Sequence, residues 1–237
     1  MRSKHSSVTL RIGFTHGRWA AGIAGLLAAI AMLRYPGDTF RDHSTRGYSL
    51  SHNFLSDLGA TVAHNGQPNG TGTMLFIASL TILVLGMGGC LVGLIRLYSR
   101  NAATRPWVLA AGAVAAVVCA SFIGVAATPE DRMLSLHIQL TKLAFRAFPI
   151  VTLLMALASR ADRESPTRVT IAWGVLTVIL AAYVAILDWG PSTRTPTGLV
   201  VQVVAQKLVT ISAVLLIIFQ TYVADRKLVA APADSPP

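Results

Sequence analysis

The stretch SHNFLSDLGATVAHNG, residues 51–66, concentrates histidine, serine, asparagine and aspartate side chains in an otherwise apolar chain. Ser56 stands directly before Asp57, and His52 and His64 flank them. A serine nucleophile needs a base within hydrogen-bonding reach, and His137 is the candidate for that role. Spacing along the chain does not bring Ser56 and His137 together, so the residue types alone do not establish a serine hydrolase.

Metal chemistry is a second possibility for the same residues. A catalytic zinc ion takes three protein ligands and leaves one position open. Asp57 and His137, with His52 or His64 from the loop, would supply three, and the alternative function is therefore a metal-dependent intramembrane lipid hydrolase. The sequence lacks two histidines four residues apart on one helix, and a neighbouring Lys142 would repel a dication. We therefore predict no catalytic residue, no metal ligand and no cofactor.

The elements that must position these side chains are membrane helices. The chain has 237 residues, of which 53% are hydrophobic and 13% are charged, whereas a soluble domain carries about 25% charged residues. A hydrocarbon core of about 30 Å requires about 20 apolar residues in a helix. The sequence predicts an all-α integral membrane bundle of one domain, residues 18–223, between an N-terminal segment at 1–17 and a disordered tail at 224–237. Its six predicted spans are 18–35, 72–97, 106–128, 133–158, 168–187 and 198–223.

Basic side chains predict the orientation of these helices. The net charge is +10, but Arg and Lys gather in short clusters between apolar runs, which argues against a nucleic-acid-binding surface. Twelve of them lie on the side that holds both ends of the chain, and five lie on the other side. The positive-inside rule then places both termini in the cytoplasm and residues 36–71 in an extracytoplasmic loop. The basic start also resembles a signal peptide, but five further spans favour an uncleaved first helix.

Within that loop, the pattern over residues 49–59 predicts a short amphipathic helix of about two turns. Leucine and phenylalanine side chains fall at helical spacing, and polar side chains occupy the opposite arc. Ser49 is a plausible N-cap and Gly59 a plausible residue after the C-cap. Two placements stay open. The helix either caps the bundle with its polar side in water, or folds into the mouth of the bundle and lines a pocket.

Two lysines are predicted near the middle of the bilayer. Lys142 in the fourth span and Lys207 in the sixth each lie about 14 Å from the end at which their helix enters. An isolated charge there costs at least ~2.5–3.5 kcal/mol, so it should face the interior and have a partner. One interpretation is an ion pair with Asp57 or Asp188 that fixes helix register. The other is a basic pocket, open to the outer face. The polar stripe predicted on the fourth span comprises Asp131, Ser135, Gln139, Lys142 and Arg146.

The favoured function is recognition of a lipid head group or similar amphiphile in that pocket. Lys142 and Lys207 supply charge, other side chains supply hydrogen bonds, and Asp57 orients them. Membrane lipid is the predicted partner, nucleic acid is not one, and the sequence does not predict an oligomeric state. The side chains predicted to line the site are Asn53, Ser56, Asp57, His137, Lys142, Gln206 and Lys207.

Three short motifs carry a resemblance to a known family. NFLSDLG, residues 53–59, resembles the Asn-x-x-Ser-Asp-Leu-Gly signature of a bacterial membrane family catalogued as domain of unknown function 998. TPEDRMLSLH, residues 128–137, is similar to its second signature, and Gln206 and Lys207 resemble the polar pair of its last helix. The matches span about residues 18–223. The resemblance implies six helices in a bacterial cytoplasmic membrane, and no activity. That family is distantly similar to the Frag1/DRAM/Sfk1 group, which is tied to lipid organisation.

Overall fold

The computed structural model describes residues 2–230 of the chain, and the side chains of residues 8–229. Six long α-helices make up the described part, and each is long and apolar enough to cross a membrane. This confirms the predicted all-α six-helix bundle. In chain order the helices are α1 (Arg2–Arg34), α2 (Gly70–Tyr98), α3 (Arg105–Ala127), α4 (Glu130–Ala161), α5 (Thr167–Trp189) and α6 (Pro196–Ala230).

The first and last helices are longer than their apolar runs predict. α1 begins at Arg2, about four turns before residue 18, and α6 continues to Ala230, so residues 224–230 are helical and not part of a disordered tail. Asp225 explains part of this extension, because its carboxylate lies 2.9 Å from Arg11 and 3.1 Å from Arg18 and joins the two helices beyond their apolar parts. The predicted disorder of residues 231–237 lies outside the described residues.

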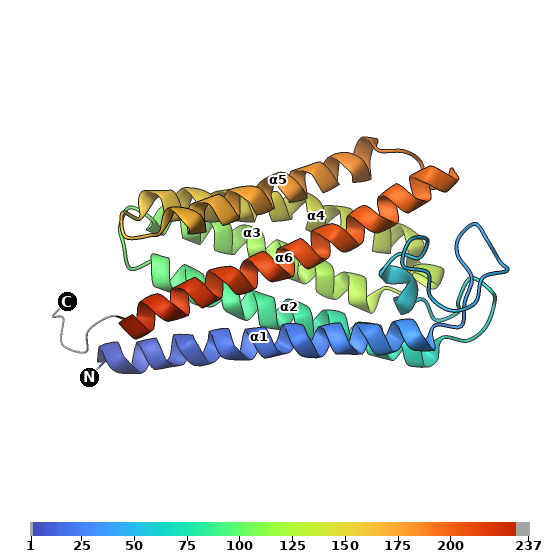
Figure 1. Cartoon of the computed structure of the whole chain (residues 1–237), viewed down its shortest axis with the longest axis horizontal. Coiled ribbons are helices and arrows are strands. Elements are labelled where there is room, and N and C mark those ends of the chain that lie inside the picture. Colours follow the sequence, from blue (N-terminus) through green and yellow to red (C-terminus); the bar gives the residue numbers. More distant parts are fainter. Residues whose placement is uncertain (1, 231–237) are drawn as a thin grey trace.

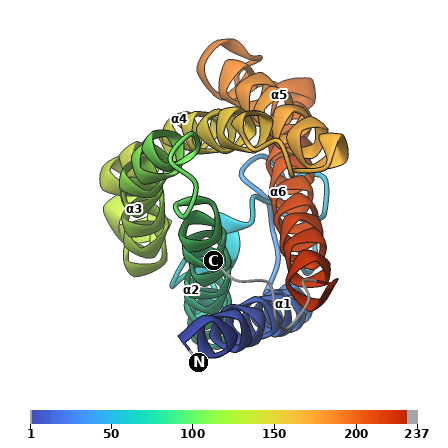
Figure 2. The same ribbon diagram turned by 90° about the vertical axis from the view of Figure 1, so that its left-hand side faces the viewer.

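The six helices stand in a ring in chain order. Figure 2 looks along the bundle from the end that holds both termini, which we call the terminal end. Each helix packs on the next one, and α6 closes the ring against α1 and α2. Close packing of α1 on α2 depends on small residues: an added Cβ would lie 2.4 Å from Ala20 at Gly86 and 2.6 Å from Phe14 at Gly93.

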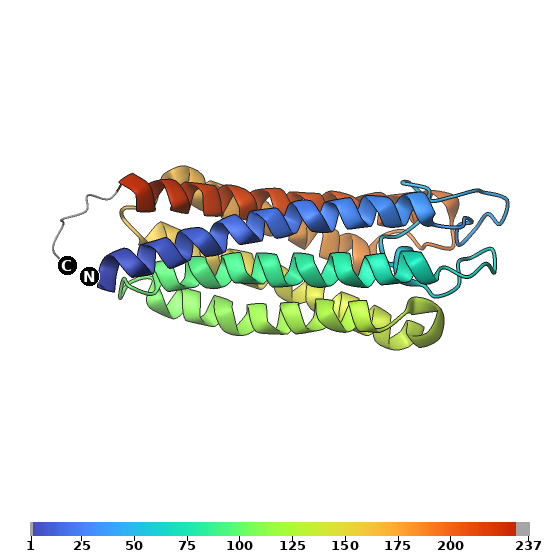
Figure 3. The same ribbon diagram turned by 90° about the horizontal axis from the view of Figure 1, so that it is seen from below.

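Residues 35–69, which we call the cap, cover the opposite end of the ring, the loop end (Figure 1). α6 is inclined to α1, so the two helices are farther apart at the loop end than near Asp225 (Figure 1). Figure 3 shows α1, α2 and α3 running along the long axis of the molecule. The cap therefore sits where the seam between α1 and α6 is widest.

The cap does not contain the predicted two-turn amphipathic helix. Instead, a turn at residues 50–52 leads to a single 3₁₀ turn, η1 (Ser56–Gly59). Asn53 is the physical reason, because its side-chain oxygen accepts a hydrogen bond from the Ser49 backbone N–H and so competes with a continuous helix. At the end of η1, a Cβ on Gly59 would lie 2.5 Å from the Phe76 ring of α2. Glycine thus lets η1 pack directly on α2.

Candidate functional site

Asn53 is the centre of a polar network at the base of the cap. Its side chain is fully buried, and its amide nitrogen donates to the Asp38 carbonyl at 3.0 Å and to Asp57 Oδ2 at 2.8 Å. Buried polar groups without partners cost about 1–3 kcal/mol each, and here Asn53 satisfies groups on three parts of the cap. The polar side of this segment is therefore buried within the cap, whereas Leu50, Leu55 and Leu58 of the same segment line the cavity below it, so the structure matches neither of the two predicted placements.

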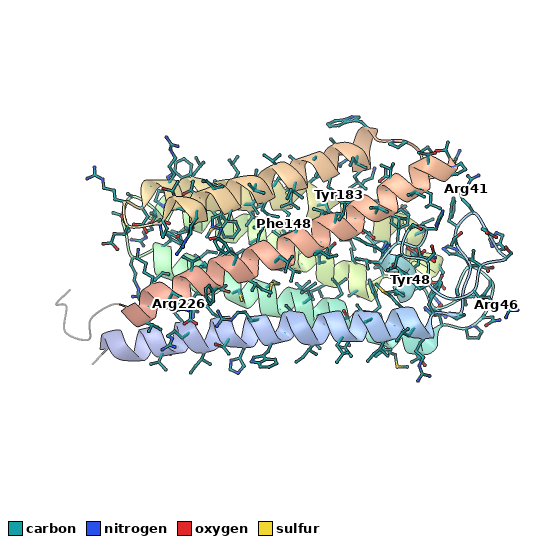
Figure 4. The ribbon with its side chains drawn as sticks, viewed as in Figure 1. Arg41, Arg46, Tyr48, Phe148, Tyr183 and Arg226 are labelled. Carbon is teal, nitrogen blue, oxygen red and sulfur yellow. The ribbon has the colours of Figure 1, made fainter. Side chains whose placement is uncertain are left out.

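Two side chains of α6 reach up into this network. Lys207 Nζ donates to the Asn53 carbonyl at 2.5 Å and lies 5.3 Å from the centre of the Tyr48 ring. Gln206 Oε1 accepts a hydrogen bond from the Leu55 backbone N–H at 2.8 Å. Figure 4 shows Tyr48 at the base of the cap beside α6. The pair at positions 206 and 207 thus holds the cap onto the last helix.

An acidic cluster lies next to Asn53. Asp57 is 2% exposed, and His64 Nε2 lies 3.4 Å from Asp57 Oδ2. Glu130, the first residue of α4, approaches the same carboxylate and the Ser56 hydroxyl. The contact with Asp57 raises the pKa of His64 above its usual value. Burial, and after it the Asp57 carboxylate, raise the pKa of Tyr35, so its phenol stays protonated beside the acids.

His137 does not join this cluster as the sequence predicts for a site histidine. Its Nδ1 lies 2.6 Å from the carbonyl oxygen of Thr128, and the ring is buried. The imidazole therefore ties α4 to the end of α3, a structural contact. The histidine within ion-pair distance of Asp57 is His64, so His137 is not the histidine of this cluster.

Lys142 is the second site residue that the structure places elsewhere. Its Nζ lies 3.7 Å from Asp188 Oδ1, and Arg146 donates to both oxygens of the same carboxylate at 2.8 and 2.9 Å. Asp188 belongs to α5, so Lys142 has one of the two acidic partners that the sequence leaves open. The pair is not buried in the interior as predicted, because the side chains of Lys142 and Arg146 are 37% and 53% exposed. Lys142 and Lys207 therefore have different partners and do not converge on one basic pocket.

The predicted polar stripe on α4 is broken at its start. Met133 has φ −133° and ψ 40°, so the first turn of α4 points differently from the rest of the helix. Asp131, in that turn, accepts hydrogen bonds from the Thr61 hydroxyl and from the backbone N–H groups of Thr61 and Val62. A helical wheel assumes one straight helix, and it therefore misplaces the residues on either side of Met133.

An apolar cavity of about 480 Å³ lies inside the ring, below the cap. Side chains of α1, α2, α3, α4 and α6 line it, together with Leu50, Leu55, Ser56 and Leu58 of the cap. Its volume is in the range of about 300–1,000 Å³ that is typical of ligand pockets. Ser56, Gln206 and Lys207 provide polar groups where the cavity meets the cap. The cavity thus has a long apolar part and a polar end.

The cavity has exposed lining residues on α1 and α6, which is where we infer that it opens. Some of its lining residues are also exposed on the outside of the bundle, namely Ile211 and Leu215 of α6, at 56% and 60%, and Gly25 of α1. These positions lie on the two helices that diverge toward the cap (Figure 1). The opening therefore faces the surface that surrounds the helices, which would be hydrocarbon in a membrane.

Of the seven predicted site residues, five gather at the loop end and two have other contacts. Asn53, Ser56 and Asp57 belong to the cap, and Gln206 and Lys207 meet it from α6. Glu130, Tyr35 and Tyr48 also belong to this region, and the sequence predicts no role for them. The feature of the sequence that could have identified Glu130 is its position directly after Pro129. The first turn of a helix that begins there is able to face a loop rather than the interior of the bundle.

No family model, curated protein or solved structure matches the chain, so its resemblance to the family catalogued as domain of unknown function 998 stays a prediction.

Proposed function

We propose that the protein binds a membrane lipid, with one acyl chain in the cavity and the head group at the cap. The observation that carries this proposal is the cavity itself, which is apolar along its length and polar where Ser56, Gln206 and Lys207 meet the cap. Lys207 has three N–H donors, and the Asn53 carbonyl accepts one of them. The other donors are available to an anionic or polar head group.

The depth of the cavity supports an acyl chain as the occupant. On α6 the lining runs from Gln206 to Ile217, which is about 16 Å of helix at 1.5 Å per residue. A hydrocarbon core is about 30 Å thick, so this length corresponds to one leaflet. The opening between α1 and α6 supports the same occupant, because a lipid would enter from the leaflet without leaving hydrocarbon.

Orientation and location belong to the same proposal. The excess of Arg and Lys at the terminal end favours a cytoplasmic position for both termini, which puts the cap and the head group on the extracytoplasmic side. The site would then take lipid from the outer leaflet of a bacterial cytoplasmic membrane. A cysteine introduced at the exposed Gln67 of the cap, labelled with a membrane-impermeant maleimide in intact cells, tests this orientation.

Two lysines give a matched test of the binding site. Lys207→Met should lower the fraction of purified protein that carries a phospholipid about tenfold or more, because a lost charge-assisted hydrogen bond is worth about 1.5–3 kcal/mol. Lys142→Met should leave that fraction unchanged, because Lys142 lies against Asp188. Native mass spectrometry in detergent, with phosphatidylglycerol added, measures both.

Equal lipid occupancy in the two variants would contradict the proposal. Thermal unfolding of each variant serves as the control, since Lys207 also anchors the cap through the Asn53 carbonyl. A variant that melts like the parent chain but loses lipid separates binding from folding.

A further inference from the structure

Three side chains with metal-ligating atoms converge at the loop end from three separate segments. Asp57 comes from η1, His64 from the turn that follows, and Glu130 from the first turn of α4. One ligating atom from each lies within 4.8 Å of the other two. Because the three residues belong to separate segments, the tertiary fold and not the local chain brings them together.

The charges of this cluster are not balanced by neighbouring lysines or arginines. Among residues 8–229, His64 is the basic side chain within ion-pair distance of Asp57, and no lysine or arginine lies that close to Glu130. Lys207 approaches from α6, but its ammonium donates to the Asn53 carbonyl. Two carboxylates that share a buried site repel each other unless a proton or a cation lies between them. Glu130 and Asp57 are within hydrogen-bonding contact, so without metal a proton lies between them, and a bound cation would take its place.

The basic pair on α4 does not oppose a cation here. Lys142 and Arg146 would repel a dication if they faced the cluster, as the straight-helix pattern predicts. In the structure both contact Asp188 of α5 instead. The break at Met133 separates the turn that carries Glu130 from the part of α4 that carries these cations.

An unpartnered hydroxyl points to a missing ligand at the same place. Tyr35 is 3% exposed, and its hydroxyl lacks a well-formed hydrogen bond to any described residue, with the backbone of His64 as the nearest candidate partner. The ring packs with Leu58 and Ala63, the chain neighbours of Asp57 and His64. Asp57 and Glu130 both lie near enough to the Tyr35 phenol to act on it electrostatically. A buried hydroxyl of this kind normally has a partner, and a metal-bound water would provide one.

The separation of the His64 and Asp57 ligand atoms fits a small divalent ion. Ligand atoms about 2.1 Å from a tetrahedral ion are about 3.4 Å from each other, and His64 Nε2 lies 3.4 Å from Asp57 Oδ2. A charge-assisted hydrogen bond between the same atoms would be about 2.7–2.9 Å long. One imidazole and two carboxylates form a mixed nitrogen and oxygen set, which suits zinc and manganese better than calcium or magnesium.

We propose that Asp57, His64 and Glu130 bind one divalent transition-metal ion, with the Tyr35 hydroxyl hydrogen-bonded to a water on that ion. Glu130 also contacts the Ser56 hydroxyl, and Ser56 lines the cavity. Ser56 therefore lies between the proposed ion and the place where a head group would lie. This site does not depend on lipid binding, and lipid binding does not depend on the ion.

The test uses the purified full-length chain, stripped with a chelator and then titrated with Zn²⁺ or Mn²⁺. Isothermal titration and elemental analysis should find one ion per chain. Glu130→Gln and His64→Gln should each raise the dissociation constant about 100-fold or more, because each removes one of three ligands. His52→Gln is the matched control, since His52 belongs to the same cap but its Nδ1 lies 2.8 Å from the Ser51 hydroxyl.

Folding is monitored separately, so that a loss of metal binding through a missing ligand is distinguished from a loss through unfolding. Without metal, Glu130→Gln should melt at the same temperature as the parent chain or higher, because it removes one of two repelling carboxylates. Metal should raise the melting temperature of the parent chain and not that of Glu130→Gln. A parent chain that binds neither ion, or a His64→Gln variant that binds as tightly as the parent, would overturn the site. Lipid occupancy by native mass spectrometry is a separate readout, so either proposal is able to fail alone.

Discussion

At the scale of single residues, Lys142 and Lys207 show what the predicted depth of a residue in the membrane indicates and what it does not. Both lie about 14 Å from the start of their predicted spans by the helical rise, and the same argument requires a partner for each. The partners differ, because Asp188 meets Lys142, whereas a backbone carbonyl and an aromatic face meet Lys207. Depth predicts the need for a partner, but only the fold decides which one is within reach.

Asn53 offers a test of the cap at this scale. Asn53→Ala leaves the Asp38 carbonyl, the Ser49 N–H and one Asp57 oxygen without the partner that they have now. We expect a loss of about 1–3 kcal/mol in the free energy of unfolding, the usual effect of unsatisfied buried polar groups. Unfolding by sodium dodecyl sulfate in mixed micelles measures it. Gln67→Ala, at an exposed position of the same cap, is the control, and an equal effect there would contradict the role of Asn53.

At the scale of elements, the long helices follow from the sequence and the short ones do not. Every predicted apolar run lies inside an observed helix or ends within one residue of it, because about 20 apolar residues in hydrocarbon have to satisfy their own backbone. The cap has no such constraint. Its turns depend on side-chain hydrogen bonds such as the one from Ser49 to Asn53, and these compete with helix at nearly equal energy. The break at Met133 is likewise a local change of backbone conformation, and it turns the first residues of α4, including Glu130, toward the site.

The contact of η1 with α2 gives a prediction at this scale. Gly59→Ala places a methyl group 2.5 Å from the Phe76 ring, so η1 has to move away from α2. We expect a loss of about 1–3 kcal/mol in the free energy of unfolding, the usual effect of overpacking.

A double-mutant cycle with Phe76→Leu checks the cause of that loss. In the Phe76→Leu background, Gly59→Ala should cost less than half as much as in the parent chain. An unchanged cost would show that the contact with Phe76 is not the reason for glycine at this position.

At the scale of the whole molecule, the sequence predicts a bundle of six helices but not their arrangement as a ring around an apolar cavity. The cavity exists because α6 is inclined to α1, and because small side chains such as Ala24 and Ala28 face it from α1. Helix inclination depends on packing against several neighbours at once, which periodicity along one segment does not describe. The candidate site was accordingly predictable for residues near the SDLG motif and unpredictable for Glu130 and Tyr35.

A substitution that fills the cavity tests whether the cavity binds lipid, independently of any effect on stability. Ala213 of α6 lines the cavity, and Ala213→Phe would occupy part of its volume. We expect a lower lipid occupancy in native mass spectrometry together with an unchanged or higher melting temperature, because the ring gains contacts in empty space. Ala182→Phe, on the exposed surface of α5, is the control. A filled cavity with undiminished lipid would place the lipid elsewhere.

The seam between α1 and α6 has a consequence for how the bundle is made. These two helices are the first and the last of the six in order of synthesis, so the circle stays open through the insertion of five helices and closes only when the sixth arrives. Until then the inner wall faces the bilayer directly. A chain shortened before residue 196 should therefore expose the lining of the cavity to lipid along its whole length. The opening between α1 and α6 in the finished protein lies at the position where the ring closes last.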